Sequence, residues 1–123
     1  MGTQMHYHNF LFQAAKEAKK SDCKFQLGCL ALKNNKIVAK GFNRYSKSNS
    51  WTKRKGECSI HAEQICLNRT GNHYIDTLFI VRLGANGFNM ALPCKRCMAH
   101  IKRRGIKTIY FTDWQGIVQK LSL

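Results

Sequence analysis

Two short motifs constrain the fold of this chain most, because together they require two distant segments to meet. The first is His-Ala-Glu at residues 61–63, and the second is Pro-Cys-Lys-Arg-Cys at residues 93–97. The two cysteines of the second motif stand at i and i+3, which places both thiols on one face of a first helical turn. An imidazole and two thiolates together suit the borderline-soft ion Zn²⁺. A fold that uses all three ligands must bring the starts of two helices to one point.

Three protein ligands would leave one position of a tetrahedral zinc site open, which is typical of catalytic sites. The candidate ligands are His61, Cys94 and Cys97, and Glu63 follows the histidine by two residues. A carboxyl group whose pKa is raised by burial could pass a proton from water to a leaving group. The alternative is that Cys58 supplies a fourth ligand and closes a structural Cys₃His site. That alternative stays open on these residues, although it leaves Glu63 without a role.

The two motifs together resemble the signature of the zinc-dependent cytidine and deoxycytidylate deaminase superfamily. The resemblance extends over about residues 10 to 112. It includes the strand that ends in Gly41-Phe42-Asn43 and the segment GIKTIYF at residues 105–111. It implies hydrolytic deamination at C4 of cytosine or C6 of adenine, with release of ammonia.

The resemblance also implies roles for single residues of this chain. The implied roles are zinc ligand for His61, Cys94 and Cys97, and proton shuttle for Glu63. Asn43 is implied to contact the sugar or the base of the substrate. The backbone N–H of Ala62 is implied to bind the base near the carbon that is attacked.

Hydrophobic periodicity and turn residues predict the order helix, two strands, helix, strand, helix and two strands. The predicted ranges are 9–20, 26–33, 36–42, 60–69, 77–83, 93–104, 106–111 and 117–123, with a loop over 84–92. The Asn34-Asn35 pair favours a tight hairpin, since Asn tolerates positive φ angles. This order describes an α/β fold, a three-layer α-β-α sandwich with a mixed sheet, and the resemblance implies five strands. The chain is expected to be one domain over residues 1–123.

Only five residues, Thr112–Gly116, separate the last two predicted strands. Parallel neighbours need a crossover of about a dozen residues or more, so this link permits only an antiparallel hairpin. Within the superfamily that the chain resembles, members acting on free nucleosides commonly end in such a hairpin. Deaminases of tRNA adenosine, of deoxycytidylate and of the APOBEC-like type commonly insert a helix there. The hairpin therefore favours cytosine over adenine as the base.

An excess of basic residues predicts an anionic partner. Lys and Arg number 21 against six Asp and Glu, which gives a net charge of +15, and such a surface repels itself unless an anion neutralises it. Five basic residues and no acid lie between Arg44 and Lys55, interleaved with Tyr45 and Trp51. Cations beside stacking aromatics are typical of sites for single-stranded nucleic acid. A second basic cluster surrounds the second motif: Lys95, Arg96, Lys102, Arg103, Arg104 and Lys107.

These features favour a hydrolase that converts cytosine to uracil in single-stranded DNA or RNA, with Arg44, Tyr45 and Trp51 contacting the strand. The alternative within enzymes is a deaminase of free cytidine, deoxycytidine or deoxycytidylate in pyrimidine salvage. Outside enzymes, the alternative is a nucleic-acid-binding module with a structural Cys₃His zinc. Relatives with the hairpin often complete each other's sites in assemblies, so a homo-oligomer is also expected.

The sequence predicts an intracellular protein, cytoplasmic or nuclear, without a membrane partner. The first residues lack the plan of a signal peptide, and no apolar run is long enough for a membrane span. Six cysteines are therefore expected to be thiols and not three disulfides. Four histidines belong to neither motif and are predicted to be surface or satisfied histidines and not ligands: His6, His8, His73 and His100.

Overall fold

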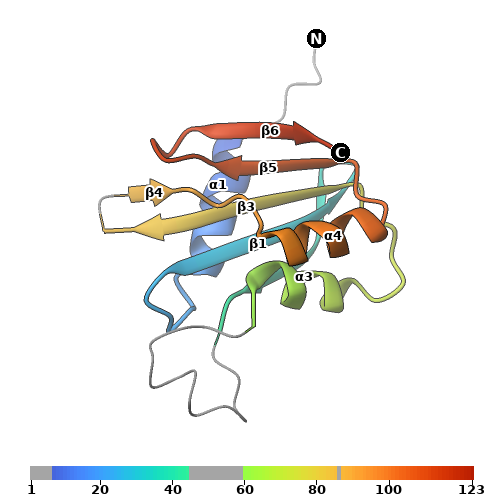
Figure 1. Cartoon of the computed structure of the whole chain (residues 1–123), viewed down its shortest axis with the longest axis horizontal. Coiled ribbons are helices and arrows are strands. Elements are labelled where there is room, and N and C mark those ends of the chain that lie inside the picture. The colour runs from blue at the N-terminus through green and yellow to red at the C-terminus, as the bar shows by residue number, and fades with distance from the viewer. Residues whose placement is uncertain (1–6, 45–59, 86) are drawn as a thin grey trace.

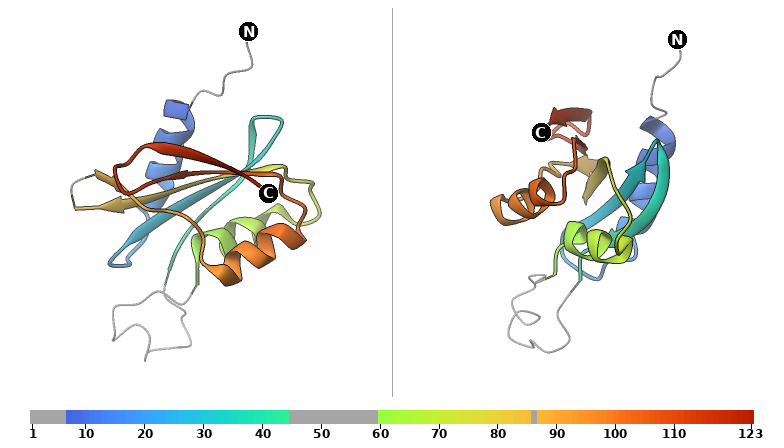
Figure 2. Two further views of the ribbon diagram at one scale, coloured as in Figure 1. Left: turned by 45° about the horizontal axis from the view of Figure 1, so that its top comes forward. Right: turned by 90° about the vertical axis from the view of Figure 1, so that its right-hand side faces the viewer.

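One mixed β-sheet separates helix α1 from helices α3 and α4, as Figure 1 and the right-hand view of Figure 2 show. The computed structural model describes residues 7–44, 60–85 and 87–123. The elements are α1 (Tyr7–Ala18), β1 (Gln26–Lys33), β2 (Lys36–Phe42), α3 (Ala62–Thr70), β3 (Thr77–Gly84), β4 (Gly87–Asn89), α4 (Lys95–Arg103), β5 (Thr108–Thr112) and β6 (Val118–Ser122). The predicted three-layer α-β-α sandwich is confirmed.

The strands follow the order β2-β1-β3-β5-β6, and β4 pairs with β3 outside that path. Strands β3 and β5 are parallel, whereas every other pair in the sheet is antiparallel. Strand β4 corrects the predicted loop over 84–92, because it adds a sixth strand to the five expected. It has only three residues, too few to show an alternating pattern. Its first residue, Gly87, has a φ angle of 122° and pairs with Gly84, and Phe88 pairs with Leu83.

The predicted hairpin between β1 and β2 is present. Asn34 and Asn35 have φ angles of 51° and 65°, and they connect the paired residues Lys33 and Lys36. A two-residue turn with positive φ at both positions matches the right-handed twist of the two strands. The Asn-Asn pair was therefore sufficient to locate this turn.

The C-terminal hairpin is also confirmed, with β5 and β6 antiparallel and Thr112 paired with Val118. One carboxylate closes its turn. The Oδ1 atom of Asp113 accepts the backbone N–H groups of Gln115 and Ile117, each at 2.9 Å. Such local bonds are typical of Asp in turns.

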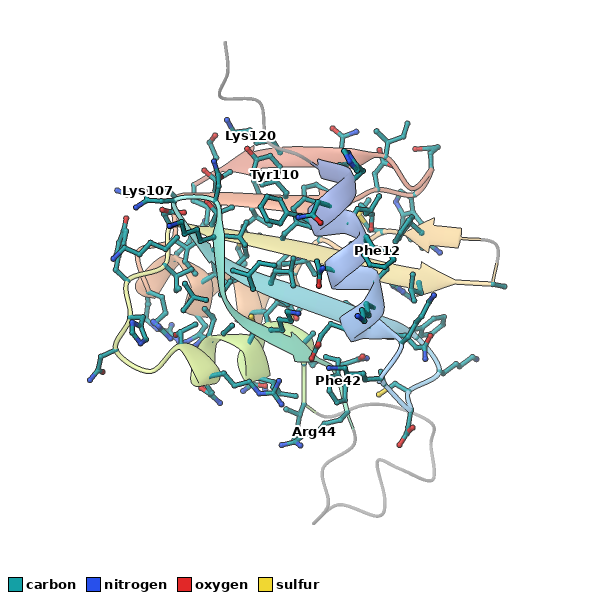
Figure 3. All side chains as sticks on the ribbon, turned by 180° about the vertical axis from the view of Figure 1, so that it is seen from behind. Phe12, Phe42, Arg44, Lys107, Tyr110 and Lys120 are labelled. Atoms are coloured by element: carbon teal, nitrogen blue, oxygen red, sulfur yellow. The ribbon has the colours of Figure 1, made fainter. Side chains whose placement is uncertain are left out.

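Side chains of β3 alternate between two hydrophobic clusters, one on each face of the sheet. Leu78 and Ile80 join the cluster under α3 and α4, whereas Phe79 and Val81 join the cluster under α1. Figure 3, seen from behind, shows α1 lying across the strands with Tyr110 on the same side. Helices α3 and α4 consequently share one face of the sheet.

Helix α3 approaches the backbone of β2 closely at Gly41. A Cβ atom at this position would lie 2.6 Å from the backbone N of Cys66 and 2.8 Å from the carbonyl O of Ala62. Only glycine permits this contact without a shift of the helix. Gly41 therefore sets the position of the first turn of α3, which carries Glu63.

The helices begin and end within two residues of the predicted limits. Helix α1 covers 7–18 instead of 9–20, and α3 begins at Ala62 instead of residue 60. Helix α3 starts late because His61 is extended, with a ψ angle of 151°. Across the described ranges, no helix is long and apolar enough to span a membrane.

The interpretation of all six cysteines as thiols is wrong for Cys23, which is disulfide-bonded. Sequence spacing does not show which cysteines a fold brings together. Free thiols are present at Cys29, Cys66, Cys94 and Cys97. Cys58, the proposed fourth ligand of a closed zinc site, lies outside the described residues.

Candidate active site

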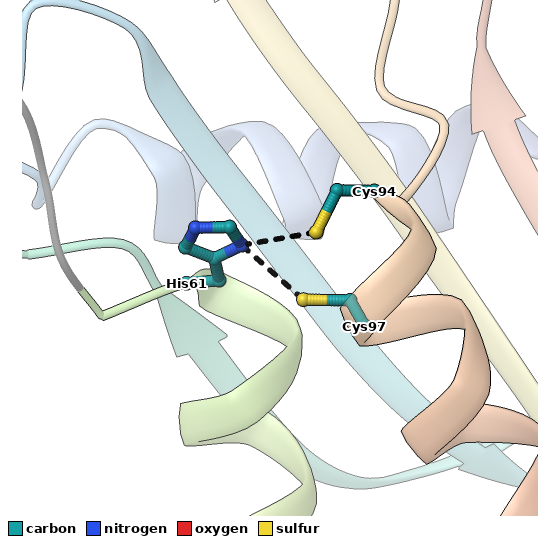
Figure 4. Close-up of side chains that lie close together, drawn as sticks. All are labelled: His61, Cys94 and Cys97. Carbon is teal, nitrogen blue, oxygen red and sulfur yellow. Dashed lines mark hydrogen bonds between the residues drawn. The ribbon is translucent and has the colours of Figure 1, made fainter.

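The two motifs stand at the starts of α3 and α4. His61 is the N-cap of α3 and Cys94 is the N-cap of α4, and neither side chain bonds to the backbone of its own helix. The imidazole of His61 and the thiol of Cys94 are therefore both available to bind a metal ion. Figure 4 shows that they point toward each other and toward Cys97, in the first turn of α4.

The position of Pro93 differs from the prediction. The sequence placed it in the first turn of the second metal-binding helix, but α4 begins only at Lys95. Cys94 is still extended, with a ψ angle of 169°, and so serves as the cap. Pro93 thus precedes the helix, and the two cysteines are the cap and the third helical residue.

The three donor atoms have the spacing that zinc requires. The Nδ1 atom of His61 lies 3.2 Å from Sγ of Cys97 and 3.8 Å from Sγ of Cys94. All three donor atoms lie within 4.8 Å of one another. Zinc bonds of about 2.3 Å to sulfur and about 2.0–2.1 Å to nitrogen, in tetrahedral geometry, separate the two donors by about 3.6 Å. The two nitrogen–sulfur distances therefore fit a zinc ion with shifts of a few tenths of an ångström.

Without a cation, the Cys97 thiol is electrostatically unfavourable as a thiolate. Burial raises its pKa well above the usual range, and the nearby Glu63 and Cys94 raise it further, while Arg96 lowers it. A divalent ion between the donors would reverse this effect, since metal ligation favours the deprotonated thiol. The electrostatics of the site are thus those expected of a metal centre.

Glu63 lies in the first turn of α3 and is only 3% exposed. Burial raises the pKa of its carboxyl group, against smaller opposing effects of its own backbone N–H and of His61. Its Oε1 atom is buried and has no hydrogen-bond partner among the residues described. Burying a carboxylate oxygen without a hydrogen bond costs free energy. The atom therefore marks a position where a bound group can donate a hydrogen bond to it.

A cavity of about 370 Å³ contains this site. Its volume is within the range of small-molecule sites. Its lining residues are His61, Glu63, Gln64, Asn68, Cys94, Arg96, Cys97, His100 and Arg103. All of them belong to α3, α4 or the caps of these helices. The cavity therefore runs between the two helices that Figure 2 shows side by side on one face of the sheet.

Asn43 does not line this cavity, and its side chain bonds to the backbone. Its Oδ1 atom accepts the N–H of Leu27 at 2.9 Å, and its Nδ2 atom donates to the carbonyl O of Phe25 at 2.8 Å. The residue is 5% exposed. In this structure it ties the end of β2 to the start of β1. Its contact with a substrate stays a prediction.

The other predicted substrate-binding residues have different outcomes. Ala62 is buried at the first position of α3, where backbone N–H groups have no partner within the helix. Arg44 is exposed, and its backbone pairs with that of Ile60. Tyr45 and Trp51 lie outside the described residues. A substrate contact of these four residues stays a prediction.

Three lining residues were not predicted: Gln64, Asn68 and His100. His100, predicted as a surface or satisfied histidine and not a ligand, is half-buried, lies outside the donor set and lines the cavity. Helical spacing could have found it, because His100 follows Cys97 by three residues and residues at i and i+3 are neighbours on a helix.

Most of the chain matches one family of known proteins. Residues 2–113 fit the family described as "Cytidine and deoxycytidylate deaminase zinc-binding region". The chain belongs to this family. Its zinc-binding character agrees with the donor set of His61, Cys94 and Cys97, which forms the candidate zinc site of this deaminase-family chain.

Individual relatives of this deaminase-family chain are distant. The deoxycytidylate deaminase of Schizosaccharomyces pombe is 27% identical over 125 residues, which cover 85% of this chain and 36% of that protein. The chain thus spans about a third of the length of this relative. The dCMP deaminase of cyanophage S-TIM5, solved in complex with dCMP and dUMP, superposes with a TM-score of 0.70 at 22% identity, over 93% of this chain and 85% of that chain. The cytidine deaminase of Burkholderia pseudomallei gives 0.71 at 19% identity, over 96% and 93%. These two likenesses show the fold.

Proposed function

We propose that this chain is one catalytic domain, a zinc-dependent hydrolase that converts cytosine to uracil and releases ammonia. One observation carries the proposal: the buried Glu63 oxygen without a partner shares a cavity with the three donor atoms. The proposed zinc ligands are His61, Cys94 and Cys97. Membership of the deaminase family supports the reaction class.

Glu63 is the group suited to proton transfer in this reaction. Because burial raises the pKa of its carboxyl group, it can accept and release a proton closer to neutral pH than an exposed glutamate. It takes a proton from the attacking water and gives it to the ring nitrogen N3 of cytosine. It then takes the remaining proton of the new hydroxyl group on C4 and gives it to the amino group, so that the C4–N bond breaks, ammonia leaves and the C4 carbonyl of uracil forms. When bound, zinc would supply Lewis acidity for this hydrolysis. The backbone N–H of Ala62 lies in the first turn of α3, where it has no partner within the helix, and we propose it as the group that binds the base.

Two classes of substrate are supported by different observations. The antiparallel hairpin of β5 and β6 supports a free substrate, most directly a cytosine nucleoside. The names of the relatives, which include deaminases of deoxycytidylate and cytidine, support the same class. The net charge of +15 instead supports single-stranded DNA or RNA. We place a free cytosine nucleoside or nucleotide first, because the hairpin and the names of the relatives both support a free substrate. The polynucleotide is the second candidate.

A deamination assay tests this proposal. The zinc-loaded protein is incubated with dCMP, cytidine, deoxycytidine and a cytosine-containing single strand, and the formation of uracil is measured. We expect turnover of a free cytosine compound. Turnover of the single strand alone would establish the second candidate. No turnover of any substrate, together with tight and salt-sensitive binding of the strand, would overturn the enzyme proposal in favour of a binding module.

A further inference from the structure

Helices α3 and α4 are held together at both ends. At their N-terminal ends, His61 meets the two cysteines of α4. At the other end, the Arg104 guanidinium donates to the carbonyl O of Leu67 at 3.2 Å and to Oγ1 of Thr70 at 2.7 Å. The cavity lies between these two connections. It is therefore a groove with defined ends that opens from the metal site.

The two walls of this groove have different chemistry. Arg96, His100 and Arg103 stand at i, i+4 and i+7 of α4, so they share one face of that helix. Gln64 and Asn68 stand at i and i+4 of α3 and form the opposite wall. We call the space between these five residues the inter-helix groove. It presents two cations, an imidazole and two amides.

The positive charge of the inter-helix groove is not neutralised from within. Glu63, at the buried metal end, is the one acid that lines the cavity in the described part of the chain. Arg96 and Arg103 are exposed, and no hydrogen bond or ion pair joins them to any described residue. Arg104 and Arg69, by contrast, are bonded to carbonyl groups. Two guanidinium groups are thus available for an anion beside the proposed reaction centre.

A guanidinium group suits phosphate, because its planar fork can donate two parallel hydrogen bonds to two phosphate oxygens. The amides of Gln64 and Asn68 can donate further bonds to phosphate or sugar oxygens. The groove and the metal site share one cavity. A molecule bound in both would therefore carry its base at the metal and its phosphate between the helices.

On the basis of the proposed function, we propose that the inter-helix groove binds the phosphate of the cytosine substrate. Arg96 precedes the ligand Cys97 and contacts the phosphate nearest to the base. Arg103 lies seven residues further along α4, a rise of about 10 Å. It contacts a more distant phosphate when the substrate is a polynucleotide. The groove thereby makes the enzyme select phosphorylated cytosine over the nucleoside.

The test compares kcat and KM of zinc-loaded variants on dCMP, deoxycytidine and a cytosine-containing oligonucleotide. Arg96→Gln and Arg103→Gln each have a matched control, Lys95→Gln and Lys102→Gln. These lysines neighbour the arginines on α4, are exposed and do not line the cavity. Each control variant therefore removes the same charge as its arginine variant, but from outside the groove. We expect Arg96→Gln to raise KM for dCMP about tenfold or more, with kcat and zinc content little changed. The KM for deoxycytidine should stay within about twofold.

The effect of Arg103→Gln shows whether the bound phosphate belongs to a mononucleotide or to a strand. If Arg103→Gln raises KM for the oligonucleotide alone, the groove binds a strand, and if it leaves both unchanged while Arg96→Gln acts, the groove binds a mononucleotide. Equal effects of each arginine variant and its lysine control would overturn the inference, since they would reflect net charge alone. Equal effects of Arg96→Gln on dCMP and deoxycytidine would overturn it too, and both results would leave the proposed function intact.

A binding measurement separates this inference from the proposed function. If the wild-type protein deaminates none of the substrates, dCMP and inorganic phosphate are titrated into the zinc-loaded protein. Binding that Arg96→Gln weakens about tenfold and Lys95→Gln does not would support the phosphate site without the reaction. Binding that is absent, or that both variants weaken equally, would overturn it.

Discussion

The Nδ1 atom of His61 lies 3.2 Å from the Sγ atom of Cys97, although 36 positions separate the two residues in sequence. The contact joins the start of α3 to the first turn of α4. It exists because both helices pack on the same face of the sheet, where their side chains share one hydrophobic cluster. The fold therefore assembles the donor set, and a zinc ion has little rearrangement to drive.

Loss of one ligand is expected to abolish zinc binding. Cys97→Ser should lower zinc affinity more than about 100-fold, since even the hydrogen-bond partners of metal ligands contribute about 10- to 100-fold. Cys66→Ser is the control, because this buried thiol in α3 donates to the carbonyl O of Ala39 and lies outside the cavity. Metal analysis after dialysis gives the number of zinc ions bound per chain for each variant.

Cys58→Ser tests the alternative of a closed site. We expect this variant to retain zinc, and a loss of zinc would identify a closed four-ligand site.

Removal of the Glu63 charge is expected to separate catalysis from stability. Glu63→Gln should lower kcat by about 10²- to 10⁴-fold, the range of general acid–base catalysis, while zinc content stays unchanged. Its Tm should stay equal or rise, because burial makes the charged carboxylate unfavourable there.

Glu17→Gln provides the matched control for this experiment. Glu17 is also 3% exposed, but it pairs with Lys20 at 3.0 Å and with Arg69 at 3.7 Å. Glu17→Gln should lower Tm, because it weakens these ion pairs, and should leave kcat nearly unchanged. Full activity of Glu63→Gln would contradict its assignment as the proton shuttle.

Arg104 and Arg103 are neighbours in sequence with opposite expected effects on stability. Arg104→Ala removes bonds to the carbonyl O of Leu67 and to Thr70 Oγ1, and should lower the free energy of unfolding by about 1.5–3 kcal/mol. Arg103→Ala removes an exposed side chain and should change it by less than about 0.5 kcal/mol. Urea unfolding measures both values. Equal losses would show that Arg104 does not hold the ends of the helices together.

The stability of the C-terminal hairpin is expected to depend on acid pH through Asp113. Bonds from the side chain of Gln119 and the N–H of Ile117 lower the pKa of this carboxyl group in the folded state. A folded pKa below the unfolded value stabilises the fold above the unfolded pKa, about 3.9. This contribution is lost as pH falls through the lower, folded value.

Asp113→Asn should therefore lower Tm at pH 7 and flatten its decrease below about pH 4. Asp22→Asn, at an exposed residue outside the hairpin, is the control. Thermal unfolding between pH 2 and pH 7 shows the difference. Identical pH profiles of the wild type and Asp113→Asn would contradict the assignment.

The sequence alone predicted the candidate donor set and most of the fold, and its two motifs indicated the family to which the chain belongs. It could do so where the chemistry is local: Asn34-Asn35 specifies a tight turn, and the short link Thr112–Gly116 permits only a hairpin. The HAE and PCKRC motifs place the ligands at helix starts for the same reason, since spacing along a helix fixes the face on which side chains lie. These features depend on residues within a few positions of one another.

Tertiary structure decided which polar groups are free and which are already bonded. The basic cluster around the second motif looked uniform in sequence, yet Arg104 joins two helices while Arg96 and Arg103 line a groove. Asn43 bonds to the backbone of Phe25 and Leu27, which local sequence could not show. The physical reason is the same in each case. A side chain finds its partners across elements that meet only when the sheet and helices have packed.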